Sequence, residues 1–262
     1  MKFNHNITII GSGNVAWHLV FAFTQAGVSI NKVISRNKEH AKELAKLVKA
    51  DFGDQINAIR PETTLVLICV TDSAVENIIS GIQDCNIPFA HTAGSIPLPV
   101  IEKSEINAGV FYPFQTFTKN VRMGDVDFPV CIEATSGGML EMLKDLASKI
   151  SKRVIELDSP QRKKLHLAGI FANNFSNYLF TKAFKYLESN NIESNLLIPL
   201  IDETVKKIHI THPEELQTGP ARRNNKKIIE EHLSILASDK NLSELYSRLS
   251  KDIIEYYKIK HG

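Results

Sequence analysis

The fold of this chain is decided by the stretch Ile7-Thr8-Ile9-Ile10-Gly11-Ser12-Gly13-Asn14-Val15-Ala16. Its first four residues are β-branched and mostly apolar, which predicts a buried strand that ends at Gly11. Apolar residues then recur from Val15 at the spacing of one helix face, and Gly27 closes that pattern. The stretch therefore predicts a strand, a glycine-rich turn and a helix at the start of a β-α-β unit.

The turn has the pattern Gly-x-Gly-x-x-Ala, in the context that a dinucleotide-binding turn requires. Gly11 permits the tight turn, Gly13 lets a pyrophosphate approach the backbone, and Ala16 lets the helix pack closely against the strand. The start of the helix supplies free N–H groups and a partial positive charge for phosphates. A plain strand–helix turn rich in small residues is the alternative. The residues expected to bind the nucleotide are Gly11, Ser12, Gly13, Asn14 and Val15.

Outward from this turn, short apolar runs alternate with helical patterns as far as Leu157, and only helical patterns follow. Such alternation is typical of a parallel sheet with crossover helices. We therefore predict an α/β fold, with a Rossmann-type parallel sheet domain over residues 1–158 and an all-helical domain over residues 159–262. The expected strands are 7–10, 30–35, 64–70, 88–92, 108–111, 128–133 and 153–157, and the expected helices are 15–26, 38–48, 73–79, 138–150, 159–188, 194–207, 221–236 and 242–258.

Composition limits the class of protein. The 262 residues are 43% hydrophobic and 23% charged with a net charge of +2, which excludes a disordered or coiled-coil chain and gives no basic excess for nucleic acid. The longest apolar run, Leu65–Val70, is too short to span a membrane, and residues 1–6 lack the layout of a signal peptide. Cys69, Cys85 and Cys131 are widely spaced, which disfavours a disulfide framework or a zinc site. We expect a soluble cytoplasmic protein without a metal.

The end of the second predicted strand distinguishes between two cofactors. An NAD site normally has Asp or Glu there, which accepts hydrogen bonds from the ribose 2′-hydroxyl. This chain has Ser35, Arg36 and Asn37 instead. Ser35 and Asn37 can donate to a 2′-phosphate, and Arg36 can pair with it or stack on adenine. We therefore predict NADP, with NAD less favoured; the alternative for Arg36 is a solvated surface cation.

Two more polar groups follow predicted strands, at the edge where open α/β sheets bind their ligands. Val70, Thr71 and Asp72 follow one strand, and His91 and Ser95 follow the next along the chain. We expect all five to border the cofactor. Alternatively, Asp72 only caps the next helix, and His91 is a histidine whose hydrogen bonds are satisfied in its loop.

A polar stripe runs along the first helix of the second predicted domain. At about 100° per residue, His166, Asn173 and Asn177 fall on one narrow line, with Gly169 on or near it. The other faces of this helix are apolar. We predict that the stripe lines a cleft, that Gly169 makes room for a ligand, and that the two amides orient a substrate or a carboxamide. Histidine ordinarily titrates near neutral pH, so His166 is the predicted acid or base. A polar network that satisfies other helices is the alternative.

The stretch Thr218–Asn224 is a further cluster. Gly219 and Pro220 are expected to open a helix, with Arg222 and Arg223 in its first turn. Cations are disfavoured at that end of a helix dipole, which points to an anion nearby. A surface ion-pair cluster is the alternative.

These motifs together resemble a bacterial family that joins a Rossmann-like NADP-binding domain to a helical domain of unknown function. The resemblance covers nearly the whole chain and is carried by Gly11–Ala16, His91–Ser95, Pro113–Phe117, His166–Asn177 and Thr218–Asn224. The family is grouped with the NADP oxidoreductases called coenzyme F420-dependent, and its layout is similar to pyrroline-5-carboxylate reductase, prephenate dehydrogenase and the 3-hydroxyisobutyrate dehydrogenases. The resemblance implies a dehydrogenase or reductase that forms a dimer.

The chain departs from those dehydrogenases at two places. They use a lysine followed four residues later by asparagine on the long helix, whereas this chain has His166 and the pair Asn173-Asn174 there. Tyr112 stands before Pro113, where related sequences often have histidine. Both departures weigh against simple 3-hydroxyacid chemistry.

The predicted function is NADP-dependent hydride transfer to or from a small C=O or C=N substrate. A non-catalytic NADP-binding sensor or partner-binding protein is the alternative. The apolar helices after Asp158 are too few to bury their own faces around one core, which predicts a homodimer built through the helical domain. Neither nucleic acid nor membrane is expected as a partner.

Overall fold

The computed structural model describes residues 3–56, 59–82, 86–98, 107–119, 121 and 127–261. The chain divides into two compact units, Met1–Asn173 and Asn174–Gly262, and each is described by itself. The domain boundary expected near Asp158 stays a prediction.

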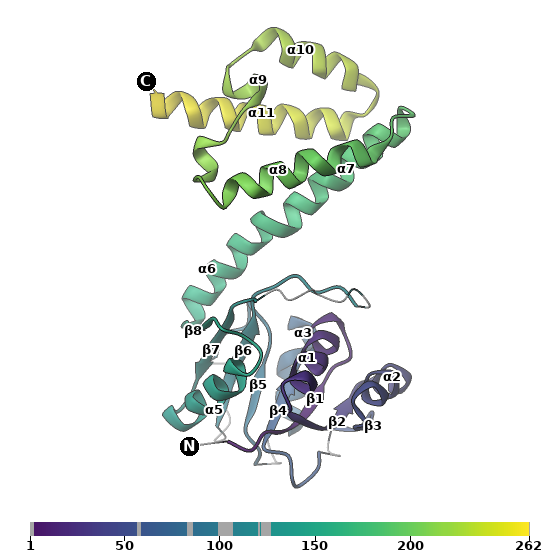
Figure 1. The fold of residues 1–262 in the computed structure, drawn as a ribbon, viewed down its shortest axis with the longest axis vertical. Helices are drawn as coiled ribbons and strands as arrows, with labels where there is room; N and C mark the ends of the chain where they lie inside the picture. Colours follow the sequence, from purple (N-terminus) through teal and green to yellow (C-terminus); the bar gives the residue numbers. More distant parts are fainter. Residues whose placement is uncertain are drawn as a thin grey trace. The chain divides into compact units, whose positions relative to one another are not determined.

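The first unit is built on one eight-stranded sheet of order β3-β2-β1-β4-β5-β6-β7-β8 (Figure 1). The predicted strands are all present, so the α/β fold with a mainly parallel Rossmann-like sheet is confirmed. The order reverses beside β1, which creates the switch point at which such sheets bind ligands. The strands are β1 (Asn6–Ile10), β2 (Ser29–Ile34), β3 (Asp51–Gly53), β4 (Leu65–Ile68), β5 (Phe89–His91), β6 (Ala108–Pro113), β7 (Val130–Ala134) and β8 (Val154–Glu156).

Two features of the sheet differ from the prediction. Strand β3 was not expected, because three residues that include Asp51 and Gly53 have low strand propensity. Strand β7 runs antiparallel to β6, with Tyr112 opposite Cys131, whereas the other strand pairs are parallel. An apolar strand pattern carries no direction, so the sequence could not reveal this reversal.

Helices cover both faces of the sheet. The helices α1 (Asn14–Gln25), α2 (Lys38–Val48) and α5 (Gly137–Ser148) share one hydrophobic core, and α3 (Asp72–Ile82) belongs to a second. Asn37 caps α2 as predicted, because its side chain accepts a hydrogen bond from the backbone of His40.

The long helical run after β8 is confirmed, but it is not a regular α-helix. It consists of α6 (Ser159–Gly169), a π-helical segment η3 (Ile170–Phe175) and α7 (Ser176–Ser189). Asp158 and Gln161 form a capping box at its start.

The rest of the second unit is helical too. A helix expected over 221–236 is split, because α9 ends at Arg222 and Asn224 adopts a left-handed conformation before α10. No helix among the described residues is both long and apolar enough to cross a bilayer. The segments after α7 are η4 (Ser194–Leu197), α8 (Ile198–Ile208), η5 (Pro213–Glu215), α9 (Gly219–Arg222), α10 (Lys226–Ile235), η6 (Leu236–Ser238) and α11 (Lys240–His261).

Candidate functional site

The turn between β1 and α1 has the geometry that phosphate binding needs. Gly11 has a φ of +123°, and a Cβ there would lie 2.1 Å from the carbonyl oxygen of Cys69, so only glycine fits. A Cβ on Gly13 would meet nothing within 4 Å, so the backbone is open to a ligand. Gly13 also begins α1 without a side-chain cap, and Ala16 is fully buried. Ser12, Asn14 and Val15 lie in the same turn.

The end of β2 brings Ser35 to this turn. Its hydroxyl forms a hydrogen bond with the hydroxyl of Ser12 at 2.8 Å. Arg36 and Asn37 follow and are exposed. The side-chain oxygen of Asn37 accepts the capping bond from His40, which leaves its NH₂ group to donate elsewhere. The three side chains thus offer a cation and several donors in one short segment.

The segments after β4 and β5 meet at the same edge of the sheet. The hydroxyl of Ser95 donates to the carboxylate of Asp72, which lies in the first turn of α3. Val70 and Thr71 precede that turn, and Thr71 is exposed. Asp72 therefore links the two loops, in addition to standing where a negative charge favours a helix start.

His91 ends β5 and is fully buried. Burial, together with the nearby charge of Arg162, lowers the pKa of His91 to about 3, so its ring is neutral. Its Nδ1 accepts a hydrogen bond from the backbone of Ala93, and the Nε2 proton has no partner among the described residues. Its predicted contact with a cofactor stays a prediction.

His166 lies on α6 beside the end of β6. Its Nδ1 is 3.0 Å from the hydroxyl of Tyr112, and both side chains are half-buried. Gly94, in the loop after β5, makes room for them, because a Cβ there would lie 2.7 Å from Nδ1 of His166 and 2.8 Å from the ring of Tyr112. The sequence singled out Tyr112 only as a departure from related sequences and did not predict its contact with His166, although its place at a strand end was the available signal.

The interpretation of Gly169 was wrong. A Cβ on Gly169 would lie 2.7 Å from the ring of Phe114, so this glycine makes room for an aromatic side chain rather than for a ligand. Phe114 follows β6, and its packing fixes α6 against that end of the sheet.

A buried ion pair fixes the start of α6 as well. Arg162, only 1% exposed, pairs with Glu133 of β7 and donates to the carbonyl of Ile96 at 2.6 Å. The hydroxyl of Ser159 donates to the same carboxylate at 2.8 Å. The sequence did not predict this pair, because no local pattern reveals a partner 29 residues away.

The residues predicted to form one polar stripe do not lie on one regular α-helix. Regular spacing of about 100° assumes an α-helix, but η3 is π-helical, with hydrogen bonds between residues five apart. Asn173 lies in η3, at the end of the first unit, and is exposed. Asn177 belongs to the second unit and is also exposed. Their site roles stay predictions.

The predicted position of Arg222 and Arg223 in the first turn of a helix is wrong, so the helix dipole no longer points to an anion there. Arg222 is the last residue of α9 and Arg223 is its C-cap, so both stand where a helix dipole favours cations. The guanidinium of Arg222 also lies over the ring of Tyr257, 4.4 Å from its centre.

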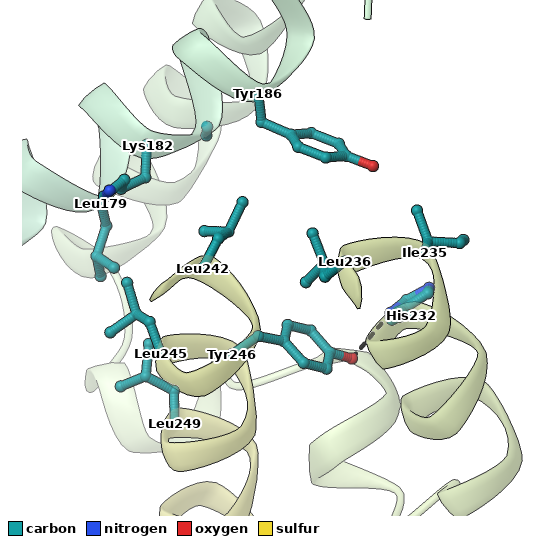
Figure 2. A pocket seen from close by; sticks show the side chains of 11 residues that line it. Leu179, Lys182, Tyr186, His232, Ile235, Leu236, Leu242, Leu245, Tyr246 and Leu249 are labelled. Carbon is teal, nitrogen blue, oxygen red and sulfur yellow. Dashed lines mark hydrogen bonds between the residues drawn. The ribbon is translucent and has the colours of Figure 1, made fainter. Parts of the chain in front are cut away.

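A hollow within the helical unit was not predicted from the sequence (Figure 2). It has a volume of about 470 Å³ and is almost entirely apolar. Its polar lining includes the pair His232 and Tyr246, whose Nδ1 and hydroxyl are 2.8 Å apart. The residues that line it are Leu179, Lys182, Ala183, Tyr186, His232, Ile235, Leu236, Leu242, Leu245, Tyr246 and Leu249.

Two family models match this chain. Residues 6–87 match the family described as NADP oxidoreductase coenzyme F420-dependent, and residues 128–253 match the Domain of unknown function (DUF2520). No curated protein matches. The family resemblance seen in the sequence is thereby confirmed.

Three solved structures are similar to this chain over nearly its whole length. A candidate NADP oxidoreductase from Bacteroides fragilis is 39% identical, with a TM-score of 0.91 over 96% of this chain and 98% of that one. An imine reductase from Myxococcus stipitatus in complex with NADP+ has a TM-score of 0.66 at 15% identity, over 98% of this chain and 96% of that one. A pyrroline-5-carboxylate reductase from Coxiella burnetii has a TM-score of 0.61 at 15% identity, over 98% of each chain. The last two show a shared fold.

Proposed function

Because this chain belongs to the family of its Bacteroides fragilis relative, with an NADP oxidoreductase domain followed by DUF2520, we propose that it transfers hydride between NADP and a small C=O or C=N substrate. One observation carries the proposal. The uncapped start of α1 and the open space above Gly13 lie at the sheet's switch point, the place at which sheets of this kind bind a pyrophosphate. A bound nicotinamide cofactor supplies the hydride, and the protein supplies orientation and a proton.

The choice of NADP rests on the end of β2. Residues 35–37, directly after that strand, include no carboxylate to accept from a ribose 2′-hydroxyl, whereas Ser35, Arg36 and the NH₂ group of Asn37 can all donate to a 2′-phosphate. Calorimetric titration of both cofactors tests this choice. Arg36→Ala should weaken NADP binding by about 1–3 kcal/mol and leave NAD binding unchanged. Equal or tighter binding of NAD by the unaltered protein would refute it.

His166 is the proposed acid or base of the reaction. Its ring is half-buried against Tyr112, and the packing of Gly169 on Phe114 holds its helix firmly, which a catalytic group requires. Asn173 and Asn177 are the proposed amides that orient substrate or carboxamide. The predicted contacts of Val70, Thr71, Asp72, His91 and Ser95 with the cofactor belong to the same proposal.

Turnover is the direct test. Purified protein is supplied with NADPH and a panel of small aldehydes, ketones and cyclic imines, and oxidation of NADPH is followed by absorbance. His166→Ala should abolish turnover while the melting temperature and NADP affinity stay nearly unchanged. Tight NADP binding without turnover of any substrate in the panel would favour the alternative function of an NADP-binding sensor.

We further propose that the helical unit binds a second copy of this chain. Large apolar side chains on α7 and α8 are exposed in the single chain, and the apolar hollow of Figure 2 opens beside α7. A soluble monomer rarely exposes so much apolar surface, which supports a homodimer through this unit. Cytoplasmic location, predicted from the sequence, is part of the same proposal. The exposed residues are Tyr178, Leu179, Phe180, Ile198, Leu200, Val205 and Ile208.

A further inference from the structure

Tyr112 and His166 form a pair that the proposed function does not yet use. Tyr112 lies in β6 and His166 on α6, 54 residues further along the chain. The hydroxyl of Tyr112 is 3.0 Å from Nδ1 of His166, and the two rings meet edge to face at 67°. Gly94 lies against both rings, since a Cβ there would come within 3 Å of each.

We propose that Tyr112 is a positioning residue for His166, in which its hydroxyl donates to Nδ1 and so holds the neutral imidazole with its proton on Nε2. This inference deepens the proposed function, since it rests on His166 as the group that meets the substrate.

The hydrogen-bond arrangement favours Tyr112 as the donor. Its hydroxyl makes no other hydrogen bond to the described residues, so if Nδ1 donated instead, the hydroxyl proton would have no acceptor among those residues. Burial raises the pKa of Tyr112 to about 12, which keeps that proton on the oxygen at neutral pH. An imidazole nitrogen with a free lone pair is the acceptor that satisfies it.

The hydrogen bond from Tyr112 determines which ring nitrogen of His166 can contact a substrate. With Nδ1 occupied, Nε2–H is the free donor of the neutral ring, and it has no hydrogen-bond partner in the described part of the chain. It matches a substrate atom with a lone pair, such as a carbonyl oxygen or the nitrogen of a neutral imine, and not an iminium cation. A hydroxyl also accepts, so Tyr112 can hold the ring in place when both nitrogens carry protons.

Nitrogen NMR of the imidazole rings tests this directly. The ¹⁵N-labelled protein, without cofactor or substrate, is measured at neutral pH by a long-range ¹H–¹⁵N correlation, which tells protonated from unprotonated ring nitrogens. His166→Gln identifies the signals of His166 by their loss. We expect the Nε2–H form to dominate in the unaltered protein. Tyr112→Phe should lower the ratio of Nε2–H to Nδ1–H about five-fold, the factor that corresponds to about 1 kcal/mol.

The helical unit provides a matched control. Tyr246 contacts Nδ1 of His232 in the same way, at 2.8 Å. Tyr246→Phe should change the signals of His232 and leave those of His166 as they were, whereas Tyr112→Phe should do the reverse.

The outcomes are distinct. A dominant Nδ1–H form of His166 in the unaltered protein overturns the proposal, even if Tyr112→Phe does not fold. An unchanged ratio in a folded Tyr112→Phe variant overturns it too. Neither result depends on turnover, so absence of activity with every substrate would count against the proposed function alone.

Discussion

The two units of this protein bury their apolar side chains to different extents. In the first unit, Leu143 of α5 is fully buried in the core that α1, α2 and α5 share. In the second unit, Leu200 of α8 remains 64% exposed, and α7 carries further exposed aromatic and aliphatic side chains. The first unit completes its core within one chain, whereas the helical unit leaves apolar side chains exposed, which the proposed homodimer would cover.

The same contrast holds for ion pairs. Arg162 and Glu133 form a pair in the first unit that water hardly reaches, and a network of hydrogen bonds surrounds it. Arg248 and Asp252 form a pair on α11 of the second unit, with an arginine side chain that is 79% exposed. The first pair fixes structure, while the second is a solvated surface pair.

Removing one partner of each ion pair gives the largest expected difference. Arg162→Met should lower the free energy of unfolding by about 3–5 kcal/mol, because it leaves the carboxylate of Glu133 without its countercharge. Arg248→Met should change it by less than about 0.5 kcal/mol. Urea unfolding measures both. Similar changes in the free energy of unfolding for the two variants would contradict the difference between the two ion pairs.

Substitutions that remove apolar contacts should affect the two units differently: the loss of stability should depend on protein concentration only in the helical unit. Leu143→Ala should cost about 2–5 kcal/mol at any concentration, because it opens a cavity in a complete core. Leu200→Asp should convert the proposed dimer into a monomer, and it should destabilise the protein only at concentrations at which the unaltered chain forms that dimer. Light scattering and thermal unfolding over a concentration series test this. A monomeric unaltered protein at micromolar concentration would remove the basis for the second expectation.

Acid should weaken the first unit through His91. Its pKa is about 3 in the folded chain and near 6.5 when unfolded, so the unfolded state binds more protons between these values. The contribution of His91 to the free energy of unfolding is therefore fully present above about pH 6.5 and is lost as the pH drops. The loss amounts to about 2 kcal/mol at pH 5. Urea unfolding at several pH values measures it. His91→Leu should remove this part of the decline, and the control His209→Leu, at an exposed site of the second unit, should leave it in place.

The smallest expected effect on stability comes from the phosphate turn. Gly13→Ala should change the free energy of unfolding by no more than about 0.5 kcal/mol, since its Cβ enters open space. NADP should bind about tenfold or more weakly, because the methyl group occupies the approach of the pyrophosphate, a loss of about 1.4 kcal/mol. Gly137→Ala, which also places a Cβ in open space but lies in α5, is the control and should bind NADP normally. Equal affinity of the two variants for NADP would argue against a phosphate site at Gly13.

Local patterns predicted most of the first unit. The order of small and apolar residues from Ile7 to Ala16 is enough to specify a strand, a turn and a helix, because each step depends only on neighbours in the chain. Asn37 was predictable as a helix cap for the same reason. The reversed direction of β7 was not, because strand direction follows from the path of the whole chain.

The candidate site was only partly predictable. His166 stood out as a polar residue on an apolar helix, but its partner Tyr112 lies on a distant strand. The π-helical turn of η3 has no clear signature in residues Ile170–Phe175, and it displaced the stripe that a regular helix would have formed. Contacts between distant segments depend on tertiary packing, which helical periodicity does not report.

The close fit of Gly94 has a consequence for the evolution of this family. Any side chain at that position would collide with the rings of His166 and Tyr112 at less than 3 Å. A relative that carries a larger residue there can therefore keep neither ring in its present place. The three positions should vary together among relatives, and a lineage that loses this glycine should also have replaced the histidine–tyrosine pair.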